Sequence, residues 1–262
     1  MHTIPGPDRR EDYTIDFASA VALGLVPGWG CVTKFGQNLD VDTGSDEDVW
    51  DGGGTWAPPT QARIHTIAST SVNDTLLGTG SRQVHVYGVS GWLRKDEVVD
   101  MNGAGGVSTA NAYEVIDRMH SENAGALGVN DGDITATAQT DATVTAKILA
   151  GKGQTLMAIV AIATAVKFLL YDYYYSIGRP AVPAAASGDA YLYVKEEADQ
   201  PDSTWRTRHV LTGSTEGGLP TQKDFKVPIT IQGPAIVRLR TTNFTEDNSI
   251  VPGGFDGYTV QQ

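Results

Sequence analysis

The chain has 262 residues, a net charge of −12 and a single cysteine. With 31 acidic against 19 basic residues and no run of Lys or Arg, it lacks a positive surface that would neutralise a row of phosphates, which argues against nucleic acid as a partner. The lone Cys31 excludes both an intramolecular disulfide and a cysteine-based zinc site.

Residues 1–60 differ from the rest of the chain, because five prolines interrupt them and ten acidic residues stand against three basic ones. One short helix is predicted over 13–25, ending before Pro27 because the residue preceding a proline is pushed away from helical angles. The remainder is predicted to be an extended N-terminal arm that docks on its own domain, a sister subunit or another protein. Its aromatic anchors are Trp29, Phe35, Trp50 and Trp56. The alternative is that these side chains fill the edge of one local core.

The acidic stretch DVDTGSDEDVWDGGG places five aspartates within twelve residues of this arm. A calcium-binding EF-hand loop needs glycine at position 6 and a bidentate Glu at position 12. Counted from Asp40, the glycine falls one position early and Asp51 replaces the Glu. A solvated acidic turn is therefore the preferred interpretation. The alternative is a weak calcium site formed by Asp40, Asp42, Asp46 and Asp48.

Residues 61–150 consist of short β-rich runs, with frequent alternation of polar and apolar positions, separated by Gly, Asn, Asp and Ser clusters. Strands are predicted at 62–69, 82–88, 97–101, 112–119, 133–138 and 143–149. Strands of this length and spacing indicate an antiparallel β-sandwich, in which each strand buries one face and leaves the other wet.

The run GQTLMAIVAIATAVKFLLYDYYYSIG, residues 153–178, is the most apolar and aromatic part of the chain. Its uncharged stretch is shorter than the roughly 20 residues of a bilayer-crossing helix, and Lys167 interrupts it, so we expect a core element and no membrane insertion. The preferred interpretation is two strands, 156–163 and 166–177, joined by a hairpin turn at Thr164 and Ala165. A continuous helix over 156–172 is the alternative.

Residues 151–262 are predicted to form a second sandwich of jelly-roll type. Its further strands are predicted at 190–196, 205–211, 225–231, 235–241 and 257–260. Strand alternation predicts that Tyr171, Tyr173 and Tyr175 share one face of the sheet. The preferred interpretation is that these tyrosines are core residues, and the alternative is that they stack on glycans.

Catalytic motifs are missing from the sequence: it contains no nucleophile elbow, no H-E-x-x-H, no P-loop and no dinucleotide-binding glycine pattern. The five histidines are spread singly along the chain; His65 and His85 are expected on strands, most simply on a wet face. The loop 196–203 could supply a carboxylate pair for glycoside hydrolysis, but it has no apolar floor to raise the pKa of an acid. Its acidic residues are Glu196, Glu197, Asp199 and Asp202. We therefore expect a protein that is not an enzyme.

Four runs carry a resemblance to a known type of protein: KFGQNLDVDTGSDEDVWDGGGTW, SVNDTLLGTGSRQVHVYGVSG, GVNDGDITATAQ and GKGQTLMAIVAIA. Residues 34–163 resemble structural proteins of tailed bacteriophages, many of them from aquatic hosts. The resemblance implies a virion protein, assembled in the host cytoplasm, and transfers no site residues. In that type a proline-glycine-lysine turn usually follows the GQTLMA strand, where this chain has IATAVKF.

The combined prediction is an all-β protein with an arm (1–60) and two antiparallel, jelly-roll-like β-sandwiches (61–150 and 151–262), without a cofactor unless the acidic turn binds calcium. We expect a head decoration, or cement, protein that forms a homotrimer and attaches through the arm to other virion proteins such as the major capsid protein. The runner-up is a tail-associated protein that recognises host surface glycans, and the third hypothesis is a glycan hydrolase.

Overall fold

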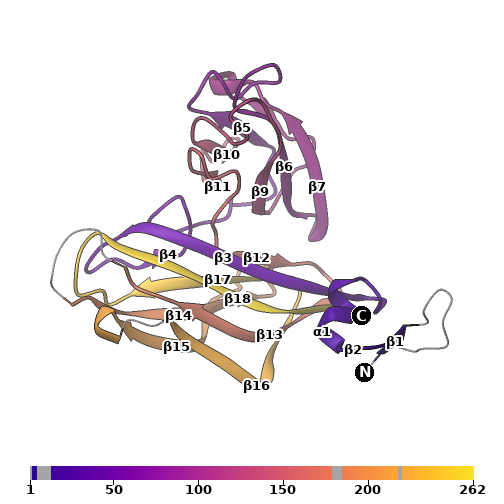
Figure 1. Ribbon diagram of the computed structural model, residues 1–262, viewed down its shortest axis with the longest axis vertical. Helices are drawn as coiled ribbons and strands as arrows, with labels where there is room; N and C mark the ends of the chain where they lie inside the picture. Colours follow the sequence, from indigo (N-terminus) through magenta and orange to yellow (C-terminus); the bar gives the residue numbers. More distant parts are fainter. Residues whose placement is uncertain (1, 5–12, 179–184, 218–219) are drawn as a thin grey trace.

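The computed structural model describes residues 2–4, 13–178, 185–217 and 220–262. The predicted all-β class is confirmed: the sheets are antiparallel, and the one α-helix among the described residues is the six-residue α1 (Phe17–Ala22). The described residues form a long lower body with a smaller unit on top of it (Figure 1).

The lower body consists of two sheets whose inner faces share one hydrophobic core. One sheet has the order β16–β13–β18–β3, and the other has the order β12–β17–β14–β15 with β4 also paired to β17. The core includes Phe168, Tyr173, Leu192 and Phe255. The strands are β3 (Trp29–Val41), β4 (Glu47–Asp48), β12 (Ile159–Ile162), β13 (Val166–Tyr175), β14 (Ser187–Glu196), β15 (Trp205–Ser214), β16 (Thr221–Gln232), β17 (Ala235–Thr242) and β18 (Ser249–Gln261).

The upper unit is inserted into the lower body between β4 and β12. It also has two sheets around a common core, β11–β10–β5–β8 and β7–β6–β9. Its strands are β5 (His65–Ser69), β6 (Ser81–Ser90), β7 (Leu93–Asp100), β8 (Val107–Ser108), β9 (Val115–Ala124), β10 (Ile134–Ala138) and β11 (Val144–Ile148). Six of these seven strands overlap the ranges predicted from the alternation of residue types.

Strand β12 joins the two cores, which explains the uninterrupted apolar run in the sequence. Ile159 and Ala161 pack into the core of the upper unit, whereas Val160 and Ile162 pack into the core of the lower body. All four residues of the strand are buried. A strand buried on both faces needs apolar side chains at every position, so the usual alternation is lost.

The predicted turn at Thr164 and Ala165 exists, but it does not close a hairpin. Ala165 adopts a positive φ of 59°, and the amide of Val166 donates to the carbonyl of Ala163. Strand β12 then pairs with β17, while β13 pairs with β16 and β18 in the opposite sheet. The turn carries the chain from one sheet to the other, and the alternative of a helix over 156–172 is wrong.

The prediction of an extended arm through residue 60 is wrong for β3 and β4. Strand β3 pairs with β18 from Trp29 to Val41, so this segment is part of the sheet. Gly36 of β3 allows a close approach, because a Cβ atom at this position would lie 2.4 Å from backbone atoms of Val49 and Ala158. Prolines and acidic residues in the flanking segments gave residues 1–60 an arm-like composition although β3 itself has none of these prolines.

The N-terminal segment ahead of β3 forms a short hairpin and a helix. Strands β1 (His2–Ile4) and β2 (Tyr13–Ile15) pair with each other and, among the described residues, with no other strand. They stand beyond the end of the two sheets, near α1 and the C-terminus (Figure 1). The helix is shorter than predicted because Asp16 caps it, accepting the Ser19 amide at 3.0 Å. Residues 1 and 5–12 of the predicted arm lie outside the described residues.

Candidate functional site

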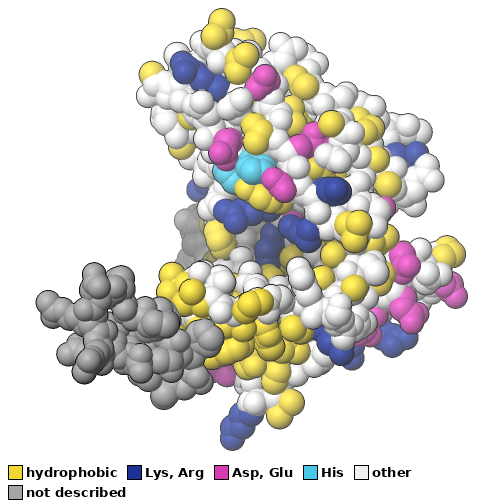
Figure 2. All heavy atoms as spheres, turned by 90° about the vertical axis from the view of Figure 1, so that its right-hand side faces the viewer, with side chains coloured by type: hydrophobic (Ala, Val, Ile, Leu, Met, Phe, Trp, Pro, Cys, Tyr) yellow, Lys and Arg dark blue, Asp and Glu magenta, His cyan; other side chains and the backbone are white. Residues whose placement is uncertain are grey.

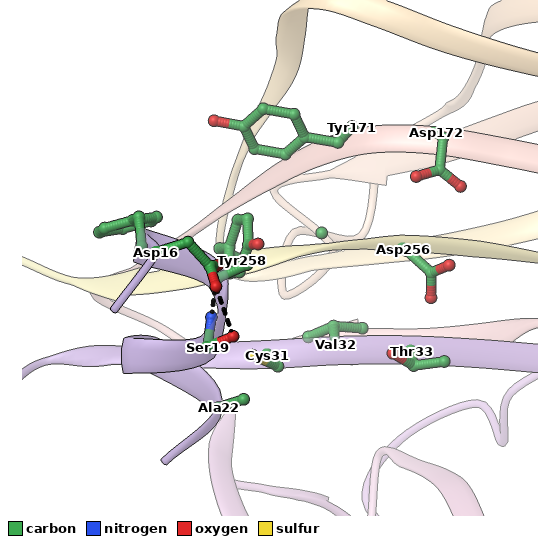
Figure 3. A pocket seen from close by; sticks show the side chains of 13 residues that line it. Asp16, Ser19, Ala22, Cys31, Val32, Thr33, Tyr171, Asp172, Asp256 and Tyr258 are labelled. Carbon is green, nitrogen blue, oxygen red and sulfur yellow. Dashed lines mark hydrogen bonds between the residues drawn. The ribbon is translucent and has the colours of Figure 1, made fainter. Parts of the chain in front are cut away.

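A groove runs between α1 and the outer face of the sheet β16–β13–β18–β3. Phe17 of α1 packs edge-on against Trp29 and Tyr258, with ring centroids 5.1 and 5.6 Å apart. This contact fixes α1 over one part of the sheet and leaves a groove of about 730 Å³ beside it. We call this hollow the α1 groove, and Figure 3 shows the side chains that line it.

Aromatic and acidic side chains share the sheet side of the α1 groove. Tyr171 and Tyr258 come from neighbouring strands and meet edge to face at 5.5 Å. Farther from α1, Asp172 and Asp256 lie next to each other on the same two strands (Figure 3). The groove therefore offers apolar ring surface at one end and negative charge at the other.

Three carboxylates form a row across the sheet, which we call the acidic row: Asp224 on β16, Asp172 on β13 and Asp256 on β18 are direct cross-strand neighbours. Burial, Asp256 and Asp224 together raise the pKa of Asp172 to about 6. The Oδ1 atom of Asp256 is buried and has no hydrogen-bond partner in the described part of the chain. Like charges placed directly opposite one another destabilise a sheet, so this row is an unfavourable arrangement in the isolated chain.

A β-bulge on β13 creates this surface. The register shifts between Leu170 and Asp172, so Tyr171 and Asp172 both lie between inward-facing Leu170 and Tyr173. The prediction that Tyr171 shares a face with Tyr173 and Tyr175 is therefore wrong. The latter two are buried in the core, as the preferred interpretation expected, while Tyr171 is 37% exposed.

The buried tyrosines are also committed to internal hydrogen bonds. The Tyr173 hydroxyl lies 2.7 Å from Nδ1 of His209, and the Tyr175 hydroxyl donates to the Gly188 carbonyl at 2.6 Å. Neither ring can stack on a glycan without unfolding the sheet. The acidic row itself was not found from the sequence, because its three members come from strands whose pairing the sequence did not specify. The available signal was a single Asp inside each of three β-rich runs.

The four predicted aromatic anchors have different environments. Trp50 and Trp56 are 5% and 1% exposed and belong to the core between the two parts of the molecule. The indole nitrogen of Trp56 also donates to the Thr145 carbonyl at 2.8 Å. These two side chains fill a local core, as the alternative interpretation held, and are not accessible to another subunit. Trp29 is half-buried under α1, and Phe35 is 40% exposed on the outer face of the sheet.

The aspartates of the predicted calcium site do not converge. Asp48 is fully buried, and its Oδ2 lies 2.9 Å from Nη1 of Arg238 and 3.2 Å from Nη2 of Arg240. The same carboxylate accepts the Trp56 amide at 2.7 Å. Asp40 and Asp46 are exposed, while Asp42 accepts the amide of Asn248. Within the described residues these four carboxylates form no cluster that could hold an ion.

The loop predicted to supply a carboxylate pair has its first acidic residue in ion pairs. Glu196 lies 2.6 Å from Nη2 of Arg208 and 4.0 Å from Nη1 of Arg206. The Glu196 carboxylate therefore faces two arginines, whereas a glycosidase pair needs it to face a second carboxyl group across a sugar cleft.

A second hollow, about 610 Å³ in volume, separates the upper unit from the lower body. Basic side chains gather in it, and a hydrophobic patch lies below (Figure 2). Arg94 pairs with buried Asp117 at 2.5 Å, and Lys34 donates to the Asp117 carbonyl. Burial lowers the pKa of Lys34 to about 8, against the opposing effect of Asp117. Burial alone would raise the pKa of Asp117, but Arg94 and Lys34 hold it below its usual range. These contacts connect β3 of the lower body with β7 and β9 of the upper unit.

The chain matches no protein-family model and no curated protein. In the described part of the chain, no helix combines the length and the apolar character that crossing a bilayer requires.

Proposed function

We propose that this protein is a non-enzymatic structural component of a tailed-bacteriophage particle, most specifically a head decoration protein. It attaches through the β1–β2 hairpin and the α1 groove. We further infer that each pair of sheets is a β-sandwich, with the smaller sandwich inserted into the larger, and that the attachment arm is confined to the segment ahead of β3.

The observation that carries the proposal is the hairpin. Among the described residues, β1 and β2 pair only with each other and stand beyond the end of the body. An isolated two-stranded hairpin is marginally stable at best in water and needs a further strand or a packing surface. A neighbouring subunit supplies that surface in an assembled particle. This argues for a protein whose N-terminal segment is completed by assembly.

The α1 groove has the chemistry of a docking surface for a basic and apolar segment. Its ring surface comes from Tyr171 and Tyr258, and Phe35 adds exposed apolar area on the same face. Burial, together with the neighbouring carboxylates of Asp256 and Asp224, raises the pKa of Asp172 in the acidic row. A Lys or Arg from a neighbouring protein relieves this repulsion, and complementary charge speeds association with a chain of net charge −12. We propose that the neighbours are a second and third copy of this chain and the major capsid protein.

The other two functional hypotheses have less support from the described residues. Glycan binding at the sheet retains Tyr171 but neither Tyr173 nor Tyr175, which are buried. Glycan hydrolysis at the loop 196–203 has its leading carboxylate held by arginines. The resemblance to phage structural proteins favours assembly over both, as does the β1–β2 hairpin, which pairs with no other strand of the described residues.

The test uses phage particles that carry variants of this chain. Deleting residues 1–15 and, separately, substituting Tyr171→Ala are expected to lower the copy number on purified particles, because truncating a central interface aromatic costs about 2 kcal/mol or more. The matched control is Tyr191→Ala, a half-buried tyrosine on the opposite sheet. Copy number is measured by quantitative mass spectrometry. Normal copy number with lost adsorption to the host would instead support the tail-associated role and reject head decoration.

A further inference from the structure

Two histidines that are far apart in the sequence meet on the outer face of the sheet β7–β6–β9. His85 on β6 and His120 on β9 are direct cross-strand partners, and their ring centroids lie 5.5 Å apart. Figure 2 shows the imidazoles as one patch on the upper unit, with acidic side chains on either side. These histidines stand singly in the sequence, and the pairing of β6 with β9 brings them together.

A β-bulge adds a carboxylate to the pair. The register of β6 with β9 shifts so that Gln83 pairs with Asn123 and Val84 with Ser121, which leaves Glu122 without a partner opposite it. Bulges of this kind redirect a side chain and occur frequently beside functional sites. Here the Oε2 atom of Glu122 lies 3.0 Å from Nε2 of His120 and 3.3 Å from Nδ1 of His85.

These distances suit a shared metal ion. Zinc binds histidine nitrogen and carboxylate oxygen at about 2.0–2.1 Å, so two ligand atoms of a tetrahedral site lie about 3.3 Å from each other. The contacts from Glu122 are close to this value, and one ligand atom from each of the three residues lies within 4.8 Å of the others. Only small side-chain adjustments are needed for all three to bind one ion.

The neighbours of His85 orient its ring for this role. Oδ2 of Asp96, on β7, lies 2.8 Å from Nε2 of His85, which places a proton on Nε2 and leaves the lone pair of Nδ1 facing Glu122. A carboxylate on the far nitrogen is the usual second partner of a metal-binding histidine. Tyr87 stacks on the ring with centroids 4.1 Å apart, and its hydroxyl, 3.0 Å from Nδ1, must turn away for Nδ1 to bind an ion.

The ring of His120 is oriented through Nε2. Its Nδ1 is buried and has no hydrogen-bond partner among the described residues. The polar contact of this ring is therefore the one that Nε2 makes with Glu122. Both imidazoles thus present one nitrogen to the same carboxylate oxygen.

We propose that His85 Nδ1, His120 Nε2 and the Glu122 carboxylate form a binding site for a divalent transition-metal ion, with Zn²⁺ as the best match. Imidazole ligands favour Zn²⁺ and its neighbours in the periodic table over Ca²⁺ and Mg²⁺. The carboxylates of Glu122 and Asp96 balance the two positive charges of the ion. The side chain of Glu122 is 44% exposed, so the remaining coordination position is open to water or to a donor from a neighbouring molecule.

This inference is independent of the proposed structural role, since the site lies on the upper unit and the α1 groove belongs to the lower body.

The test is a calorimetric titration of the full-length protein with ZnCl₂, after treatment with a chelator. We expect about one Zn²⁺ per chain and a loss of affinity on the order of tenfold or more in His120→Ala and in Glu122→Gln. The control is His209→Gln, which removes a histidine on β15 and is expected to leave zinc affinity unchanged. Circular dichroism verifies that each variant is folded.

Titration with Co²⁺ provides a second readout, because a tetrahedral or five-coordinate cobalt site absorbs visible light more strongly than aqueous cobalt. We expect this absorption in the native protein and in His209→Gln, and a reduced signal in His120→Ala. Absence of stoichiometric Zn²⁺ binding, or equal affinity in His120→Ala and the native protein, overturns the proposal. The cluster is then a hydrogen-bonded network of histidines and carboxylates without a metal.

Discussion

The ion pair of Asp48 with Arg238 and Arg240 gives the sharpest stability prediction. The carboxylate of Asp48 is fully buried, and the side chain of Arg238 is only 4% exposed. The substitution Asp48→Asn keeps the shape of the side chain and an acceptor for the Trp56 amide, but it removes the negative charge. Two guanidinium groups then remain at the joint of β4 and β17 with no opposite charge between them.

The size of the effect follows from the burial of the partners. Breaking a buried pair by neutralising one member costs about 3–5 kcal/mol. We place this case at the lower end, about 3 kcal/mol, for two reasons. The first is that the Arg240 side chain is 14% exposed and keeps part of its hydration. Arg238 also retains its cation–π contact with Trp205, 3.9 Å from the ring centroid. For a chain of this size, this corresponds to a decrease in Tm of about 6–12 °C.

The assay is urea unfolding followed by tryptophan fluorescence, together with calorimetric measurement of Tm. The matched control is Asp46→Asn, which removes the same charge two residues earlier at an exposed position and is expected to change the unfolding free energy by less than about 0.5 kcal/mol. An Asp48→Asn variant as stable as this control would refute the assignment of Asp48 as a structural ion-pair partner. Calcium-dependent stability lost in both variants would point back to a metal site in the acidic turn.

Three further predictions concern individual side chains. The folded-state pKa of Asp172 is about 6 and its ordinary value is 3.8, so the folded chain binds more protons between these pH values and loses stability as pH rises through them. We therefore expect Asp172→Asn to be more stable than the native protein at pH 7, by about 1 kcal/mol after allowance for solvent screening. Near pH 3.5 the two proteins should be equally stable, and urea unfolding measures both differences. The pKa of Lys34 is about 8 against an ordinary 10.5, so the unfolded chain binds more protons in that window and stability rises with pH through it; Lys34→Met is expected to lack this rise in a Tm series from pH 7.5 to 10.5. Asp96→Asn is expected to weaken zinc binding about 10-fold while Co²⁺ retains the absorption of an intact ligand set, because Asp96 orients His85 without binding the metal; unchanged affinity would contradict that role.

The strands of residues 61–262 were predictable because most bury one face and expose the other. Strands such as β6 and β10 show alternating burial that matches the alternation of residue types in the sequence. Strand β3 was missed because prolines and aspartates flank it, and because its partner β18 lies more than two hundred residues later in the chain. Local composition does not report a pairing at that distance.

The acidic row of the α1 groove and the histidine cluster were less predictable than the strands, because both sites depend on the register of strand pairing. The bulge between Leu170 and Asp172 moves Tyr171 away from the face that simple alternation assigns to it. The bulge at Glu122 brings a carboxylate to two histidines that the sequence presents separately. A single inserted residue moves the side chains that follow it to the other face of the sheet, and the residue types in these strands do not predict the insertion.

The most direct test of the account is a density map of the intact particle, at a resolution that separates β-strands, with this chain placed in it. We predict that the chain lies on the head, with the β1–β2 hairpin and the α1 groove covered by a neighbouring subunit and a basic side chain of that subunit next to the acidic row. A map in which the outer face of the sheet β16–β13–β18–β3 and the hairpin both face solvent, or in which the chain is confined to the tail, would contradict the proposed function.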